Sequence, residues 1–306
     1  MRMENSSTGG SQFLLDASLV RRLLMRQHPD LADKPISETA NGWDNSTFRL
    51  GDQLAVRLPR REAAAGLILN EQRWLPQFKN NLPLAIPAPV RTGLPQDEYP
   101  WHWSIVPWIP GTTADLAAPD KQQAVVLAAF FNALHAAAPE EAPHNPVRGV
   151  PLVQRVESVN LRIKSLADKG VLIPKRLMDC WYDAVAAPVD VGPTWIHGDL
   201  HPRNILIQEG QIQAIIDWGD VAQGDRATDL AAIWMLFSCP ESRALAIAAC
   251  NHVSAITWVR ARGWALLFAV VFMDAVLPGT TSMAAIGEQI VKNLMEDLPA
   301  HGSAMA

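Results

Sequence analysis

The residues with the clearest capacity for chemistry lie together in one polar stretch of the second half of the chain. It reads H-G-D-L-H-P-R-N-I-L from His197 to Leu206, and I-I-D-W-G-D follows from Ile215 to Asp220. Two apolar segments bracket the polar loop, and an aspartate stands at the end of the second. Polar groups beside an apolar sheet are costly unless they are paired or bind something. The stretch therefore predicts a functional site.

The spacing inside this stretch favours phosphoryl transfer. Asp199 and Asn204 are separated as in the catalytic loop of kinases, where the aspartate accepts the proton of the substrate hydroxyl and the asparagine binds magnesium. Asp217, in D-W-G, corresponds to the aspartate that holds magnesium on the nucleotide phosphates. We therefore predict Asp199 as catalytic base and Asn204 and Asp217 as Mg²⁺ ligands, with ATP or GTP as co-substrate.

Two other classes of function fit part of this pattern. His197, Asp199 and His201 form H-x-D-x-H, which could hold zinc for a hydrolase. That hypothesis leaves Asn204 and Asp217 without a role, and the other histidines are scattered. A nucleotide-binding module without catalysis would be expected to lack the base or a metal ligand, yet all three residues are present.

The elements expected in the first hundred residues form a small sheet with helices. Asp16 can cap a first helix, and Gly51-Asp52 can join two alternating runs into a hairpin. The expected elements are strands at Ser46–Leu50, Gln53–Leu58 and Trp103–Val106, an edge strand at Ile86–Arg91, and a helix from Glu62 that ends at Leu75 before Pro76.

Beyond Pro107, Pro110 and Gly111 the pattern becomes helical. Helices are expected at Gln122–Ala138, Val153–Ala167, Arg176–Ala187, Arg226–Phe237, Ser242–Arg262, Trp264–Leu277 and Met283–Leu298. A β segment interrupts them through Thr194–Ile196, Ile205–Ile207 and Ile212–Ile216, with a turn at Glu209-Gly210. We predict an α+β fold with a β-rich nucleotide-binding lobe at 1–107, of which 1–12 is a flexible tail, and a helical lobe at 108–306.

The charge and the cysteine content of the chain indicate which binding partners and which cellular compartment are to be expected. The net charge of −5 argues against nucleic acid or an anionic membrane, since both favour a basic surface. From Trp108 onward the chain has 20 acidic and 14 basic residues, which would suit a cationic substrate. The three cysteines have no metal-like spacing, and no secretory signal is evident. Trp264–Leu277 is short for a membrane span and is predicted as a core helix. The protein is therefore expected in the cytoplasm.

The two motifs together resemble the aminoglycoside phosphotransferase family. The resemblance is sharp over residues 195–230 and collinear from Glu38 onward. It implies a protein-kinase-like bilobal fold and the roles given above for the catalytic loop. It further implies that His197 anchors this loop, that His201 supports it, and that Asp229, in G-D-R-A-T-D-L-A, braces it from the next helix.

The resemblance also points to nucleotide contacts in the first lobe. Kinases place a lysine on the third strand and pair it with a helix glutamate; here Arg57 takes that position, with Glu71 as its expected partner and Glu62 as a second choice. Arginine can bind phosphate bidentately. Further nucleotide contacts are expected at Gly42, Asn45 and Ser46, in N-G-W-D-N-S, and at Val106 and Trp108.

The acceptor is expected to be an aminoglycoside or a similar aminated antibiotic. Acidic side chains would bind such a polycation, and the candidates are Asp220, Asp274 and Glu288. Asp274 is notable because it interrupts an apolar helix. By resemblance the same fold also serves macrolides, choline, homoserine, thiosugars and fructosamines, and a fold alone does not fix the acceptor.

Overall fold

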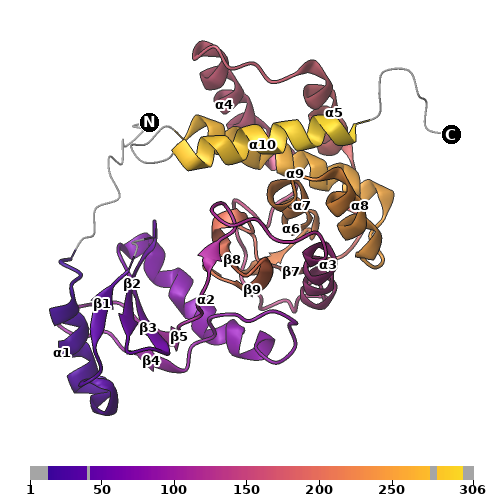
Figure 1. Cartoon of the computed structure of the whole chain (residues 1–306). Coiled ribbons are helices and arrows are strands. Elements are labelled where there is room, and N and C mark those ends of the chain that lie inside the picture. Colours follow the sequence, from indigo (N-terminus) through magenta and orange to yellow (C-terminus); the bar gives the residue numbers. More distant parts are fainter. Residues whose placement is uncertain (1–12, 40–41, 276–280, 299–306) are drawn as a thin grey trace. The chain divides into compact units, whose positions relative to one another are not determined.

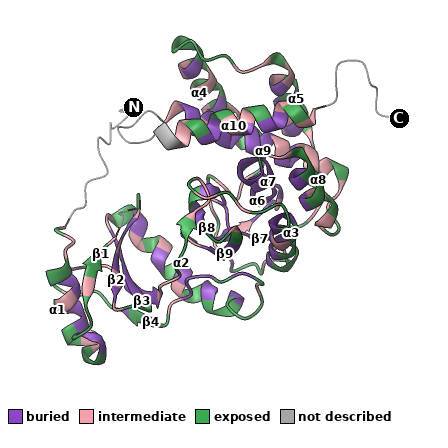
Figure 2. Ribbon diagram, viewed as in Figure 1, coloured by how far each residue is buried: buried purple, intermediate pink, exposed green. Residues whose placement is uncertain are grey.

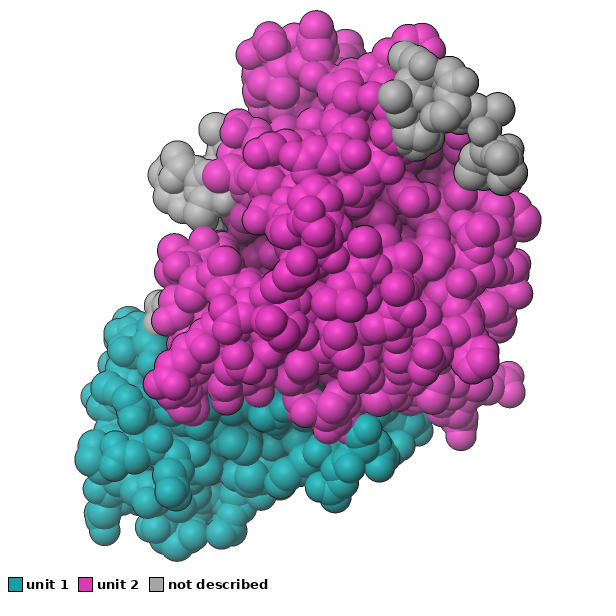
Figure 3. Space-filling model, turned by 45° about the vertical axis from the view of Figure 1, so that its right-hand side comes forward, with its two compact units in different colours: residues 1–81, 85–109 teal, residues 82–84, 110–306 magenta. Residues whose placement is uncertain are grey.

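A computed structural model describes residues 13–39, 42–275 and 281–298 (Figure 1). The tail expected at 1–12 lies outside these residues. The chain divides into two units by its internal contacts, which Figure 3 colours separately. Unit 1 contains residues 1–81 and 85–109, and unit 2 contains residues 82–84 and 110–306.

Unit 1 is built on an antiparallel sheet with the order β1-β2-β3-β5-β4. Its strands are β1 Ile36–Glu38, β2 Asn45–Leu50, β3 Leu54–Pro59, β4 Arg91–Gly93 and β5 Trp103–Pro107. The hairpin predicted between β2 and β3 is present, and Gly51 in its turn has φ 60°, which favours glycine. Pairing is in register from Asn45–Pro59 to Leu50–Leu54.

The alternation of side chains along β3 directs them to two different helices. Val56 and Leu58 join the apolar cluster that includes helix α1, Ala17–Gln27. Arg57 points to the opposite face, as successive residues of a strand do, and bonds to Glu71 on helix α2, Glu62–Phe78. The predicted cap of α1 is present, since Asp16 Oδ1 accepts the Leu19 N–H at 2.7 Å.

Two predicted boundaries in unit 1 are wrong. Helix α2 continues through Pro76, and the Lys79 N–H still bonds to the Leu75 carbonyl at 3.1 Å. Burial of Trp74, Leu75 and Phe78 offsets the hydrogen bond that proline cannot donate. The edge strand is Arg91–Gly93 rather than Ile86–Arg91, because the alternating prolines keep residues 86–90 out of the regular ladder.

The described residues of unit 2 form two small sheets. Strands β8, Ile205–Gln208, and β9, Gln211–Ile215, form the predicted hairpin, with β6, Thr112–Thr113, at its edge. Glu209 and Gly210 both have positive φ, 50° and 75°, as the favoured two-residue hairpin turns require. Strand β7, Thr194–Ile196, pairs instead with β10, Ala222–Gly224, so the expectation of one continuous β segment is wrong.

Helices make up most of the remainder of unit 2. They are α3 Gln123–Leu134, α4 Val156–Asp168, α5 Lys175–Ala186, α6 Ala227–Leu230, α7 Ala232–Leu236, α8 Pro240–Ala249, α9 Ala255–Asp274 and α10 Thr281–Asp297. Short 3₁₀ turns occur at η1 Pro29–Leu31 in unit 1, and at η2 Leu152–Arg155 and η3 Pro202–Asn204 in unit 2. The helix expected at Arg226–Phe237 is divided into α6 and α7.

Helix α9 forms the centre of unit 2 and packs against α4, α5, α6 and α10 (Figure 2). It begins after Ser254, whose hydroxyl caps the Thr257 N–H, and it continues through Gly263, where a break was wrongly predicted. A Cβ on Gly263 would lie 2.4 Å from Ala184 Cβ, so glycine permits close contact with α5. Among the described helices, α9 alone is long and apolar enough to cross a membrane, yet 67% of its most apolar window is buried within the protein.

A buried ionic cluster ties α9 to the segment that enters α6. Arg260 Nε donates to Asp225 Oδ2 at 2.5 Å, and its Nη2 donates to Asp190 Oδ1 at 2.7 Å. The side chains of Arg260 and Asp225 are 2% and 5% exposed. Because both charges are out of water, neither is tolerated there without the other.

Replacing Arg260 with leucine should therefore destabilise the protein. The change leaves the Asp225 carboxylate buried without its cation, and the free energy of unfolding should fall by about 3–5 kcal/mol in urea titrations. The matched control is Lys175→Ala, which removes a solvent-exposed pair with Asp179 and should change stability by less than about 0.5 kcal/mol. Equal effects of the two variants would contradict a role for the cluster in stability.

Candidate active site

The catalytic loop is anchored by one buried carboxylate. Asp229, on α6, is fully buried, and its two oxygens accept the backbone N–H groups of His197 at 2.7 Å and Gly198 at 2.8 Å. His135 Nε2, at the end of α3, lies 3.3 Å from the same carboxylate. Strand β7 ends at Ile196, so Asp229 fixes the backbone at the point where the chain leaves the sheet.

Gly198 and Trp218 complete the base of the loop. Gly198 has φ 86°, and a Cβ there would lie 2.8 Å from the Asp220 carbonyl oxygen, so a larger residue is excluded. Trp218 of the D-W-G motif is fully buried, and its ring contacts that of His197 with centroids 4.7 Å apart. The two motifs are thus packed directly against each other.

Both ring nitrogens of His197 are engaged by backbone groups. Nε2 lies 3.0 Å from the Ile216 carbonyl, and Nδ1 accepts the Asp199 N–H at 3.3 Å. This arrangement suits the anchoring role that the resemblance implied and leaves no lone pair for a metal. Among the residues that the structure describes, no group of three His, Cys, Asp or Glu side chains is placed to hold a metal ion. The zinc-hydrolase hypothesis therefore has no ligand set here.

The Asp199 side chain is 22% exposed and has a basic side chain on each side. Arg148 Nη2 donates to Oδ1 at 2.8 Å, and His201 Nε2 lies 3.4 Å from Oδ2. Burial works to raise the pKa of the Asp199 carboxyl, but His201 and Arg148 outweigh it, and the net effect is a pKa below its ordinary value. Asp199 is therefore an anion at neutral pH, as a proton acceptor must be.

Asn204 connects the catalytic loop to the segment after β9 that carries Asp217. Its Nδ2 donates to the Asp199 carbonyl at 2.8 Å, and its own carbonyl accepts the Ile216 N–H at 2.9 Å. The side-chain oxygen Oδ1 is therefore the atom left to bind a cation. Asp217 follows β9 with φ 60° and is exposed. Amide and carboxylate oxygens on adjacent backbone segments form the type of donor set that Mg²⁺ takes together with phosphate.

In unit 1 the expected ion pair of Arg57 and Glu71 is present. Arg57 Nη1 and Glu71 Oε2 are 2.6 Å apart, and the side chains are 8% and 1% exposed. The next residue of α2, Gln72, donates to the Trp103 carbonyl at 2.9 Å and so fixes α2 against β5. The strand-and-helix geometry expected for a phosphate-binding cation is thus formed.

The other predicted nucleotide residues lie on the strands of the same sheet or next to them. Asn45 and Ser46 are buried at the start of β2, and the Asn45 carbonyl accepts the Gly42 N–H at 3.0 Å. Val106 is buried in β5, and Trp108 follows that strand with Arg49 5.3 Å from its ring centroid. Their contact with a nucleotide stays a prediction.

The predicted acceptor residues have different surroundings. Asp220 bonds to Asn145 Nδ2 at 2.5 Å; burial and the nearby Asp199 charge raise its pKa. The Asp274 carboxylate, at the end of α9, is held by side chains of α4 and the residue after it: Arg162 at 3.2 Å, Ser165 at 2.7 Å and Lys169 at 2.8 Å. Glu288 is exposed on α10. Their roles toward an acceptor stay predictions.

Arg148 and Asn145 are site residues that the sequence analysis missed. They lie in the proline-rich loop 139–151, which gave no periodic pattern. The only local signal is N-P-V-R-G, in which an asparagine before proline favours a turn.

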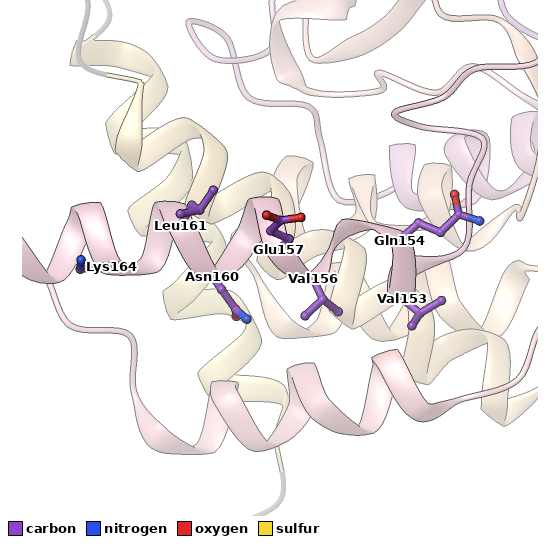
Figure 4. A pocket seen from close by; sticks show the side chains of 7 residues that line it. All are labelled: Val153, Gln154, Val156, Glu157, Asn160, Leu161 and Lys164. Atoms are coloured by element: carbon purple, nitrogen blue, oxygen red, sulfur yellow. The ribbon is translucent and has the colours of Figure 1, made fainter. Parts of the chain in front are cut away.

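An open pocket along η2 and α4 was also not expected (Figure 4); its lining residues are Val153, Gln154, Val156, Glu157, Asn160, Leu161 and Lys164. None of the predicted site residues lines it.

The fold and the catalytic loop together define a phosphotransferase of protein-kinase-like, bilobal α+β architecture. The sequence matches the model of the family described as phosphotransferase enzyme family over residues 35–264, which is more than half of the chain. The chain belongs to this family, and the predicted resemblance to aminoglycoside phosphotransferases is confirmed. It is a small-molecule phosphotransferase that transfers phosphate to a hydroxyl.

Solved structures of related enzymes share the fold. The GDP complex of aminoglycoside 2'-phosphotransferase-IIIa has a TM-score of 0.68 and 19% identity, over 93% of this chain and 100% of that one. Macrolide 2'-phosphotransferase MphH from Brachybacterium faecium has a TM-score of 0.59 and 19% identity, over 92% of this chain and 98% of that one. No curated protein matches the sequence.

Replacing Asp229 with alanine should loosen the catalytic loop. The His197 and Gly198 N–H groups would lose their acceptor in a buried site, and stability should fall by about 2–4 kcal/mol. Hydrogen exchange should show faster exchange at these two amides than at the hairpin amides of β8 and β9. Unchanged protection at His197 and Gly198 would show that Asp229 does not anchor the loop.

Proposed function

We propose that this enzyme transfers the γ-phosphate of ATP or GTP to a hydroxyl of an aminoglycoside or similar aminated antibiotic, with Asp199 as catalytic base. The observation that carries the proposal is the Asp199 carboxylate, kept anionic by Arg148 and His201 and fixed through its backbone by Asn204. Each carboxylate oxygen has two lone pairs, so Asp199 can keep its neighbours and still accept a hydroxyl proton.

Asp199 acts by orienting the acceptor hydroxyl and taking its proton as the bond to phosphorus forms. Its depressed pKa means that orientation matters more than basicity, because a weak base takes the proton late in the transfer. Asn204 keeps the loop backbone at a fixed distance from β9, and Asp229 fixes the other end of the loop. The loop is thus held at both ends around the base.

Asn204 Oδ1 and Asp217 would hold Mg²⁺, which when bound neutralises phosphate charge in this class of reaction. We assign Arg57, aligned by Glu71, to the nucleotide phosphates.

Similar structures are named as complexes of GDP, of ADP and of ATP, which supports testing both ATP and GTP. Three free cysteines and a nucleotide co-substrate support a place in the cytoplasm.

The acceptor assignment rests on the family and on the acidic residues of the second unit. Similar structures are named with kanamycin, gentamicin and streptomycin, and others are macrolide phosphotransferases. Kinases of other hydroxyl metabolites, of choline, homoserine or sugar type, are the alternative. Asp274 is already bound to two cations, so a cationic acceptor would have to compete with Arg162 and Lys169 for it.

The decisive experiment is a nucleotide-consumption screen. The purified enzyme is assayed with ATP and with GTP against aminoglycosides, macrolides and small amino-alcohol metabolites, and mass spectrometry identifies a product that has gained one phosphate. Transfer to an aminoglycoside supports the full proposal. Transfer only to another class replaces the acceptor, and tight nucleotide binding without any transfer would indicate a non-catalytic module.

Replacing Asp199 with asparagine should lower kcat by about 10²–10⁴-fold, since the amide keeps the shape but cannot accept the proton. Nucleotide affinity, measured by calorimetry, should remain within about twofold, because the base contacts the acceptor rather than the nucleotide. A variant with wild-type kcat would refute the base assignment.

Replacing Asp217 with alanine should act on the nucleotide instead. The dissociation constant for ATP or GTP in the presence of Mg²⁺ should rise about tenfold or more, because an oxygen ligand is lost. Binding measured with EDTA in place of Mg²⁺ should be similar in the variant and the wild type. If the variant binds Mg²⁺-nucleotide as tightly as the wild type, Asp217 is not a metal ligand.

A further inference from the structure

A guanidinium is built into the site beside the catalytic carboxylate. Arg148 Nη2 donates to Asp199 Oδ1 at 2.8 Å, and its side chain is 14% exposed. The guanidinium carbon lies 4.3 Å from the ring centroid of Phe268, a fully buried residue of α9. The cation therefore lies over an aromatic ring while one of its nitrogens holds the carboxylate, and these two contacts restrict where the guanidinium can lie.

The loop that carries Arg148 is shaped for this purpose. Asn145 Oδ1 accepts the N–H groups of Val147 at 2.9 Å and Arg148 at 2.8 Å, which closes a tight turn around Pro146. Thr228, adjacent to Asp229 on α6, donates its hydroxyl to the Arg148 carbonyl at 3.1 Å. Both backbone polar groups of Arg148 are thus satisfied by side chains.

The same loop is pressed against β10. A Cβ on Gly149 would lie 2.7 Å from the Gln223 carbonyl oxygen, and one on Gly224 would lie 2.9 Å from the Gly149 Cα. The two backbones therefore touch without intervening side chains. Strand β10 pairs with β7, and β7 leads directly into the catalytic loop. The same small sheet therefore positions both the loop that carries Arg148 and the loop that carries Asp199.

Holding two charges in a partly buried site is costly, and a surface arginine would serve stability better. An anionic phosphoryl group that approaches the anionic Asp199 is repelled, and like charges repel strongly where water is scarce. A cation next to Asp199 reduces this repulsion. Of the three nitrogens of the Arg148 guanidinium, only Nη2 makes a hydrogen bond to a residue that the structure describes. Its other N–H donors remain for solvent or for a reacting group.

We propose that Arg148 is a positioning residue for phosphoryl transfer: it fixes the orientation of the Asp199 carboxylate and offsets the repulsion between this carboxylate and the incoming phosphoryl group. The inference rests on the proposed function of Asp199. It adds a cation that comes from outside both sequence motifs, carried by a loop far from them in the chain.

The test compares Arg148→Ala and Arg148→Lys with the wild type in steady-state assays of the acceptor found in the screen, or of slow ATP hydrolysis if no acceptor turns over. Arg148→Ala should lower kcat by about 10²-fold while the nucleotide KM changes by less than about twofold. Arg148→Lys should recover part of the rate, since it restores the charge without the planar fork. Millimolar guanidinium chloride should partly restore Arg148→Ala.

Introducing Arg148→Ala into the Asp199→Asn variant distinguishes two roles of Arg148, positioning the Asp199 carboxylate and supporting the fold. If Arg148 acts through Asp199, adding Arg148→Ala to Asp199→Asn should cause little further loss, because residues that act as a unit are not additive. The matched control is Arg22→Ala, which removes an arginine–carboxylate pair with Glu98 on unit 1 and should leave kcat unchanged. Thermal melts check that each variant is folded, and Arg148→Lys replaces Arg148→Ala if the latter is not.

Three results would overturn the inference: a wild-type kcat in Arg148→Ala, a loss as large in the Asp199→Asn background as in the wild type, or equal losses in Arg148→Ala and Arg22→Ala. Each leaves the proposed function intact when the wild type transfers phosphate and Asp199→Asn transfers it about 10²-fold or more slowly. A wild type that transfers phosphate to neither acceptor nor water overturns the proposed function, and this inference with it.

Discussion

The site depends on one buried carboxylate that accepts two consecutive backbone N–H groups. Asp229 holds the backbone where the chain turns after β7 and so determines where Asp199 lies. A backbone donor left unsatisfied in the interior is costly, so the loop has one low-energy path rather than several. The position of Asp199 in the loop thus follows from two hydrogen bonds to its neighbours His197 and Gly198.

This anchor is itself held by the core. Asp229 lies on the short helix α6, and the segment that enters α6 is fixed by the pair of Asp225 with Arg260 of α9. Phe268 of the same helix supports the Arg148 guanidinium. A single long helix thus stabilises the helical unit and positions two sides of the catalytic loop. Stability and geometry cannot be varied independently at these positions.

The sequence predicted the parts of the site whose chemistry is encoded in short spacing. Asp199, Asn204 and Asp217 could be recognised by their spacing in two neighbouring motifs, and the pair of Arg57 with Glu71 was expected from the family resemblance. Arg148 could not be found this way, since only the fold brings its loop to Asp199. The division of the β segment between two sheets and the continuous α9 were missed for the same reason: long-range packing overrode local signals at Thr194–Ile196 and Gly263.

The contact between Gly149 and Gly224 also limits how this enzyme can diversify. No side chain fits at either position, so the distance between the Arg148 loop and β10 is set by two bare backbones and cannot drift by small substitutions. Substitutions are easier to accommodate on surfaces with room for them, such as the open face of η2 and α4, where Val153 and Leu161 are exposed. Natural or laboratory evolution of this enzyme should accordingly keep Gly149 and Gly224 and vary such surfaces instead.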